Sequence, residues 1–352
     1  MSSAAATRMA REIAEQPAAA RRTLAALLPQ RDALRALADG RRRVLFAARG
    51  SSDNAAVYGR YLLETHARVI GSLASPSVAT HYRSRLDLDD TLVVCVSQSG
   101  ATEEILATEE WARSCGAATV GVTNVEGSPL AEAADLALVT QAGPELAVPA
   151  TKTYLCQLVA MAALGTALAP DPTALDGELQ RVPDEVERLL TVDTGIGEAV
   201  AALKDAAYTV VSGRGLMMGT ALETALKLEE TCLRPVRGYS YADLRHGPIS
   251  VVTSGMTAVL VAAADGPMVG PMRELADDLT GRGATVVGLG GDQAFATACA
   301  VHVPGPGLSE PVAPLGAIVP AQRLVERLAR ALGLDPDSPR GLAKVTATDP
   351  HS

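Results

Sequence analysis

Leu92-Val-Val-Cys-Val96 is an apolar run that leads directly into the hydroxyl-rich turn Ser97-Gln-Ser-Gly100. Similar runs stand at Val44-Leu-Phe-Ala-Ala48 and Ala118-Thr-Val-Gly-Val122. A strand is apolar on both faces when helices cover both sides of a parallel sheet. Helical patterns separate the three runs, so the sequence predicts a doubly wound α/β half.

The same pattern returns later in the chain and predicts an internal duplication. Three further strands are expected, at 208–212, 257–263 and 284–289. Arg49-Gly50 after the first strand matches Arg214-Gly215 after its counterpart, at an offset of 165 residues. A repeated spacing of this kind indicates two copies of one α/β unit. The predicted fold class is therefore α/β, with two flavodoxin-like doubly wound parallel-sheet domains.

Five parts are expected along the chain. Pro170-Asp-Pro-Thr173 ends a helix that begins near Lys152, a charged helical stretch follows over 176–190, and a final helix is expected from Pro320 to Leu332. The predicted parts are an N-terminal helical segment 1–30, a first domain 31–170, a connector 171–200, a second domain 201–334 and a tail 335–352.

Composition excludes several classes of protein. The net charge of −9 argues against a nucleic-acid backbone or an anionic membrane surface as the main partner. The N-terminal region carries charges that interrupt a signal peptide, and no run approaches the length of a membrane span. We expect a cytoplasmic protein whose cysteines are small core residues, with no disulfide framework or zinc site: Cys95, Cys115, Cys156, Cys232 and Cys299.

Two hydroxyl-rich turns suggest a phosphate site in the first half. Ser97, Ser99 and Thr102 lie where a buried strand ends and a helix begins, and the first strand ends likewise in Gly50-Ser51-Ser52. Ligands bind at the carboxyl ends of parallel strands, and N–H groups at a helix start attract phosphate. The alternative is that these hydroxyls only cap the following helices. The matching turn of the second half, 261–266, has no hydroxyl, so we expect one phosphate site per chain.

A second cluster lies on a helix predicted over 219–230. Glu223, Lys227 and Glu230 are spaced i, i+4 and i+7, which puts them along one face. A solvated face with an ordinary ion pair is the alternative interpretation. His246 follows in a predicted loop before Gly-Pro248 and is a further candidate for proton transfer.

Taken in order, these segments resemble the double-SIS (sugar isomerase) family, in particular the isomerase half of glucosamine-6-phosphate synthase. The motifs are Gly50-Ser-Ser52, Ser97-Gln-Ser-Gly100, Ala150-Thr-Lys152, Ala221-Leu-Glu-Thr-Ala-Leu-Lys-Leu-Glu-Glu230, Leu244-Arg-His-Gly-Pro248 and Pro339-Arg-Gly-Leu-Ala-Lys344. Arg49-Gly-Ser-Ser-Asp53 and Pro149-Ala-Thr-Lys152 are more similar to the SIS-type glucosamine-6-phosphate deaminases. Arg49 stands beside the phosphate turn and is a candidate extra contact.

The resemblance implies a role for each matching residue. It implies substrate and phosphate binding by Gly50, Ser51, Ser52, Ser97, Gln98, Ser99, Thr102, Val148 and Ala150. It implies that Glu230 moves a proton between carbons 1 and 2, and that Glu223, Lys227 and Lys344 complete the site. It also implies that His246 opens the sugar ring from the neighbouring subunit of a homodimer, that the tail is an ordered lid, and that no metal or organic cofactor is needed.

The expected reaction is conversion of glucosamine 6-phosphate to fructose 6-phosphate and ammonia. The chain begins Met1-Ser2-Ser3 without the glutaminase domain of the synthase, which favours breakdown over synthesis of the amino sugar. Alternative substrates are galactosamine 6-phosphate and a phosphorylated fructosyl-amine. A sugar-phosphate-binding regulator is a further alternative, disfavoured because Glu230, His246 and Lys344 are all present.

Overall fold

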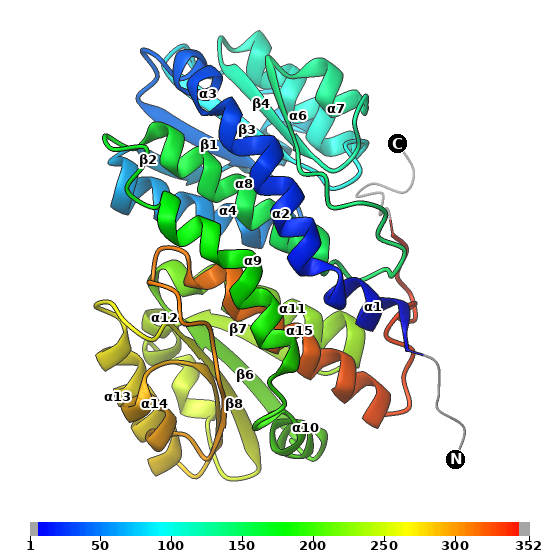
Figure 1. The fold of residues 1–352 in the computed structure, drawn as a ribbon, viewed down its shortest axis with the longest axis vertical. Helices are drawn as coiled ribbons and strands as arrows, with labels where there is room; N and C mark the ends of the chain where they lie inside the picture. The colour runs from blue at the N-terminus through cyan, green and yellow to red at the C-terminus, as the bar shows by residue number, and fades with distance from the viewer. Residues whose placement is uncertain (1–5, 345–352) are drawn as a thin grey trace. The chain divides into compact units, whose positions relative to one another are not determined.

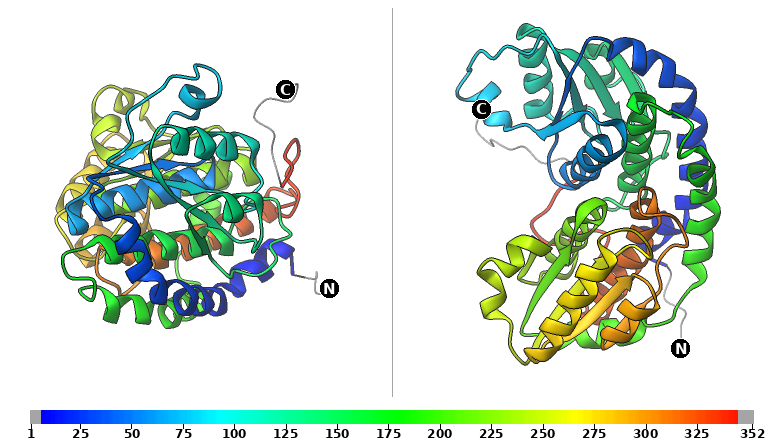
Figure 2. Two further views of the ribbon diagram at one scale, coloured as in Figure 1. Left: turned by 90° about the horizontal axis from the view of Figure 1, so that it is seen from above. Right: turned by 90° about the vertical axis from the view of Figure 1, so that its left-hand side faces the viewer.

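The computed structural model describes residues 6–344, which form two compact units, each built on one parallel sheet. The first-sheet unit comprises 18–145, 152–180 and 343–344, and the second-sheet unit comprises 6–17, 146–151 and 181–342. Figure 1 shows the elements of both units, and Figure 2 gives two further views of them.

The first sheet has the strand order β2-β1-β3-β4-β5, with all neighbours parallel. Its strands are β1 (Arg43–Ala47), β2 (Ile70–Leu73), β3 (Thr91–Val96), β4 (Ala118–Thr123) and β5 (Leu136–Val139). β3 and β4 are buried throughout, as the apolar runs predicted. The chain leaves the centre of this sheet in opposite directions from β1 and β3, which makes their carboxyl ends the topological switch point.

Helices cover both faces of the first sheet. α4 contacts β1 and β2 and packs on α8, while α6 and α7 contact β3 and β4 from the other side, where an apolar core includes Val93, Ile105 and Leu130. α8 is buried from Lys152 to Ala167, as expected of a helix that is apolar all round. The helices are α2 (Gln16–Leu27), α3 (Arg31–Leu37), α4 (Ser51–Leu62), α5 (Pro76–Thr80), α6 (Glu103–Ser114), α7 (Pro129–Ala133) and α8 (Lys152–Leu168).

The second sheet repeats this topology. Its order β7-β6-β8-β9-β10 is that of the first sheet, again with all neighbours parallel. The strands are β6 (Tyr208–Gly213), β7 (Val236–Ser240), β8 (Met256–Ala262), β9 (Thr285–Gly290) and β10 (Val301–Val303). The predicted α/β class and the duplication are confirmed.

In the second-sheet unit, α11 lies against β6 and β7 and packs on α15 (Figure 1). α13 contacts β8 and β9, α14 contacts β9, and an apolar core between them includes Leu260, Leu275 and Phe295. The helices are α1 (Arg8–Ala14), α9 (Asp176–Thr191), α10 (Ile196–Lys204), α11 (Met218–Cys232), α12 (Tyr241–Arg245), α13 (Val269–Gly281), α14 (Gln293–Ala298) and α15 (Ala313–Ala331). Short helical turns η1 to η4 lie at 28–30, 63–67, 215–217 and 248–251.

The predicted start of the final helix is wrong. α15 begins at Ala313, seven residues before Pro320, which lies buried inside the helix. Proline fits the first turn of a helix well, and this favoured a start at Pro320, but Pro314 occupies the first turn instead. An interior proline loses one backbone hydrogen bond, and burial of nearly the whole first half of α15 offsets that loss.

Candidate active site

The turn after β1 leads into α4 through a backbone shape that requires glycine. Gly50 has φ +57° and precedes Ser51, the first residue of the helix, without a side-chain cap. The Ser52 hydroxyl is buried and accepts a hydrogen bond of 2.9 Å from Gln157 Nε2 of α8. Gln157 thus fixes Ser52 in place, and sequence reasoning missed it because the two residues are 105 positions apart.

The turn after β3 is held by its own hydroxyls. Ser97 Oγ lies 2.9 Å from Thr102 Oγ1 and accepts a hydrogen bond from the Gly100 N–H. Ser99 Oγ accepts from the N–H of Ala101. Thr102 stands at the N-cap position of α6, yet its side chain makes no capping bond to the helix. The hydroxyls therefore shape the turn, and simple helix capping does not account for them.

These two turns follow adjacent strands at the switch point of the first sheet. β1 and β3 pair directly, with Ala47 opposite Cys95, so both turns leave from neighbouring strand ends. Gln98 and Ser99 are partly exposed there, next to the N-terminus of a helix of twelve residues. Free N–H groups, the helix dipole and hydroxyl donors at one sheet edge form a suitable cradle for an anion.

Arg49, the candidate extra phosphate contact, pairs with a carboxylate in the first turn of α6. Its guanidinium forms a two-point ion pair with Glu104 of α6, with Nε–Oε2 and Nη2–Oε1 distances of 2.8 Å. Planar bidentate pairing uses the same donors that a phosphate would take. Nearby, burial raises the pKa of Asp53, although the Arg49 charge partly opposes this shift.

The charged cluster on α11 is buried rather than solvated. The side chains of Glu223 and Lys227 are 0% and 1% exposed, and Lys227 Nζ lies 3.1 Å from Glu223 Oε1. The same ammonium donates a hydrogen bond to Glu230, whose side chain is 20% exposed. One lysine therefore joins a fully buried carboxylate to a partly accessible one, which an ordinary surface ion pair does not do.

The protonation state of Lys227 follows from its two partners. Burial on its own lowers the pKa of this lysine, but the carboxylates of Glu223 and Glu230 outweigh burial and raise the pKa above the ordinary value. The ammonium form is therefore held firmly at neutral pH. A fixed positive charge beside Glu230 holds that carboxylate in one orientation.

His246 lies in the same unit at the carboxyl end of α12, and its side chain is exposed. Its backbone N–H donates to the carbonyls of Ala242 and Asp243, so the backbone at this position is fixed by the last turn of the helix. Gly247 follows with φ +121°, a conformation that favours glycine. The imidazole therefore lies at the surface of the second-sheet unit.

Val148 and Ala150 lie in a short segment that belongs to the second-sheet unit. Both are partly exposed, and the Val148 N–H donates to the Asp337 carbonyl at 2.9 Å. Just before them, the N–H groups of Leu146 and Ala147 donate to the carboxylate of Glu12 in α1. The carboxylate of Glu12 and the backbone carbonyl of Asp337 therefore hold this segment, and no local pattern in the sequence points to them.

Lys344 pairs with a buried carboxylate of the first-sheet unit. Lys344 Nζ lies 2.7 Å from Glu145 Oε2, whose side chain is 0% exposed. Glu145 also accepts from the N–H and the hydroxyl of Thr153. The expected lid spans 335–352, of which residues 345–352 lie outside the described part of the chain. Glu145 was missed because its partner lies 199 positions away.

Across residues 6–344, no three His, Cys, Asp or Glu side chains gather in the way that would hold a metal ion. Within the same residues, no helix combines the length and the apolar character of a membrane span.

Comparison with known proteins places the chain in a family. The SIS domain model matches residues 37–167. Glutamine–fructose-6-phosphate aminotransferase (isomerizing) of Thermococcus kodakarensis is 35% identical over 96% of this chain, and the chain spans 57% of that enzyme's length. The chain therefore matches little more than half of that relative.

Solved structures extend the likeness to complete chains. A protein from Silicibacter pomeroyi DSS-3, assigned as a phosphosugar isomerase, is 34% identical with a TM-score of 0.85, over 94% of this chain and 100% of its own. Glucosamine-6-phosphate deaminase from Thermotoga maritima shares the fold, with 24% identity and a TM-score of 0.77 over 97% of this chain and all of its own. Together with the SIS match, the 34% identity to the Silicibacter pomeroyi protein over its whole length shows that the chain belongs to the SIS (sugar isomerase) family.

Proposed function

We propose that this protein is an amino-sugar phosphate deaminase/isomerase that converts glucosamine 6-phosphate to fructose 6-phosphate and ammonia. The observation that carries the proposal is the α11 cluster, in which buried Lys227 holds the partly exposed carboxylate of Glu230. One carboxylate that takes a proton and returns it to a neighbouring carbon is the chemical requirement of an aldose–ketose conversion.

After ring opening, Glu230 removes the proton from carbon 2 of the aldehyde form, and the electrons of the C–H bond form the carbon 1–carbon 2 double bond of an enolamine. The carbonyl oxygen becomes a hydroxyl by taking the proton that the ammonium group at carbon 2 gives up. The protonated carboxyl of Glu230 then returns the proton to carbon 1, which gives the ketimine at carbon 2. Water adds to this imine carbon and ammonia leaves, so that fructose 6-phosphate is produced and Glu230 is again ionised.

In this proposal, the two hydroxyl-rich turns bind the phosphate group of the substrate. Ser51, Ser52, Ser97, Ser99 and Thr102 take the phosphate, with backbone contacts from Gly50 and Gln98, while Val148 and Ala150 contact the sugar. Phosphate held at one end restricts the motion of the open chain and lowers the entropic cost of proton transfer. No step of this scheme calls for a metal ion or an organic cofactor.

Lys344 and His246 act at the ends of the reaction in this proposal. The ammonium of Lys344 polarises the carbonyl oxygen, and His246 moves the ring-opening proton. Because His246 is exposed beyond α12, we propose that it serves the neighbouring subunit of a homodimer. Glu223 takes no proton itself and holds Lys227 from the buried side.

A second candidate is the same conversion in the opposite direction, amination of fructose 6-phosphate. The 35% identity to an enzyme named as a fructose-6-phosphate aminotransferase favours it. Galactosamine 6-phosphate and phosphorylated fructosyl-amines remain alternative substrates in the forward direction. The same carboxylate shuttle serves all of these reactions.

The decisive experiment is an ammonia-release assay on purified protein. Glucosamine 6-phosphate is compared with galactosamine 6-phosphate and a phosphorylated fructosyl-amine, and Glu230→Gln serves as the inactive control. We expect ammonia and fructose 6-phosphate from the first substrate in equal amounts. Release from none of the three, with glucosamine 6-phosphate formed from fructose 6-phosphate and ammonium, would favour the second candidate instead.

A further inference from the structure

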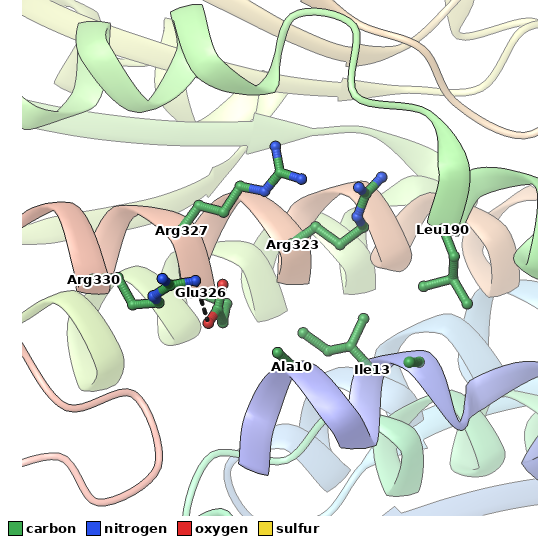
Figure 3. Close-up of a pocket in the computed structure, with 8 residues that line it drawn as sticks. Ala10, Ile13, Leu190, Arg323, Glu326, Arg327 and Arg330 are labelled. Atoms are coloured by element: carbon green, nitrogen blue, oxygen red, sulfur yellow. Dashed lines mark ion pairs between the residues drawn. The ribbon is translucent and has the colours of Figure 1, made fainter. Parts of the chain in front are cut away.

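A cavity of about 270 Å³ lies in the second-sheet unit and is lined by three arginines. None of its lining residues belongs to α11. Arg323, Arg327 and Arg330 rise from α15, while Ala10 and Ile13 of α1 lie opposite (Figure 3). The spacing of i, i+4 and i+7 puts three like charges along one helix face, which by itself destabilises a helix.

Arg323 has a structural task that accounts for its presence. It donates to the carbonyls of Leu189 and Val192, at the end of α9, and forms an ion pair with Asp193. A guanidinium at a helix C-terminus satisfies carbonyls that lack partners within the helix. Its side chain is only 11% exposed, so Arg323 forms a wall of the cavity.

Arg327 and Arg330 are less fully engaged. Arg327 Nη2 donates to Asp193 at 2.7 Å, which uses one of its five N–H donors within the described chain. Arg330 Nη1 lies 3.8 Å from Glu326 Oε1, beyond hydrogen-bond distance. Their side chains line the cavity and are 38% and 52% exposed, so both are accessible to solvent.

The charges at this site do not cancel. Three guanidinium groups face two carboxylates, those of Asp193 and Glu326, and Asp193 is shared between two of the arginines. A local positive charge therefore persists in a chain whose net charge is −9. The remaining wall is apolar, formed by Ala10, Ile13 and Leu190. An anion with a small carbon body matches both parts of this lining.

We propose that this cavity is a second anion site, which binds a phosphate monoester through Arg327 and Arg330. A guanidinium offers paired donors in the geometry of phosphate oxygens, and two such groups on one helix face hold a dianion from two sides. The apolar wall then receives the organic part of the ester. This site uses none of the residues proposed for catalysis.

The same contacts connect the cavity to the segment that carries Val148 and Ala150. Glu326 accepts a hydrogen bond of 2.8 Å from Thr7, the N-cap of α1. Further along α1, Glu12 accepts from the N–H groups of Leu146 and Ala147. A phosphate that draws Arg330 away from Glu326 changes how Glu326 holds the start of α1. Because Glu12 of α1 binds Leu146 and Ala147, a shift of α1 then changes the position of the segment that carries Val148 and Ala150. The functional meaning of this coupling rests on the proposed function, whereas the binding site does not.

Calorimetric titration with inorganic phosphate tests the site directly. We expect Arg327→Gln/Arg330→Gln to lose one phosphate-binding event, or to weaken it at least about tenfold. Arg273→Gln on the exposed face of α13 is the matched control and should behave like the wild type. A double variant that folds normally by circular dichroism and binds phosphate as the wild type does would overturn the site.

A second variant separates this proposal from the function proposed above. Ser99→Ala/Thr102→Val should remove the binding event of the hydroxyl turns and leave that of the arginines. If calorimetry finds one phosphate-binding event and only the arginine variant abolishes it, the proposed cavity site is supported. The proposed phosphate binding by the hydroxyl turns is then wrong. Hydrogen exchange at Leu146 and Ala147 tests the coupling, since added phosphate should change it in the wild type but not in the arginine variant. If added phosphate changes the exchange rates equally in the wild type and the arginine variant, or changes neither, the coupling is overturned.

Discussion

At the scale of single residues, Glu230 differs from its buried neighbour Glu223 in being partly accessible. Glu230→Gln keeps the shape and the hydrogen bond from Lys227 but removes the base. We expect turnover of glucosamine 6-phosphate to fall about 10²–10⁴-fold, while the affinity for the sugar phosphate is unchanged. Steady-state kinetics and calorimetric binding measure the two quantities. Loss of binding in parallel with turnover would indicate a structural role for Glu230.

Lys227 is expected to matter for stability as well as for catalysis. Lys227→Met fills a similar volume but leaves the fully buried carboxylate of Glu223 without this cation. Breaking a buried pair in this way costs about 3–5 kcal/mol in the free energy of unfolding. Urea denaturation measures the change, with exposed Arg273→Gln as the control. A loss below about 1 kcal/mol would show that the network contributes little to folding.

The pH dependence of this pair follows from the direction of the shift. The pKa of Lys227 is higher in the folded protein than its ordinary value, so its stabilising contribution is present throughout the neutral range. That contribution is lost only when the pH rises through the raised pKa. We therefore expect the titration of Lys227 itself to add no pH dependence to the free energy of unfolding of the wild type from about pH 6 to pH 9, measured by urea denaturation.

At the scale of elements, the turn between β3 and α6 depends on Gly100. Its φ is +63°, and an added Cβ would lie 2.1 Å from Ser128 Oγ and 2.7 Å from Thr123 Oγ1. Gly40 provides a matched control, because its φ is +73° but no atom lies within 4 Å of the added Cβ. Gly100→Ala should destabilise the protein by about 1–3 kcal/mol more than Gly40→Ala. Equal thermal shifts for the two variants would contradict this account of the turn.

The same elements show why some of the site was predictable from sequence. Ser97 and Thr102 contact each other within one turn, so a local pattern was sufficient to find them. By contrast, Glu12 and Glu145 each hold a segment more than a hundred positions away, and nothing in their own neighbourhood marks them. The burial of Glu223 was equally hidden, since spacing gives the face of a helix but not what covers it.

At the scale of the whole molecule, the duplication was readable because both sheets reuse the same apolar runs and the same strand order. The division of the chain into its two compact units could not be predicted from such a local pattern. Residues 146–151 belong with the second sheet although strands of the first sheet precede them in the chain. Their backbone is bound by Glu12 and Asp337, and contacts of this length are set by the folded chain rather than by a local pattern.

If His246 acts in the neighbouring subunit, two inactive variants should restore each other. In a hybrid of Glu230→Gln and His246→Gln chains, one site carries both changes and the other carries neither. Unfolding and refolding an equal mixture gives hybrids as half of the dimers, so activity should return to about a quarter of the wild-type value. Each variant refolded alone is the control. If His246 serves its own chain, every site in the hybrid carries one change, and the mixture stays as inactive as its components.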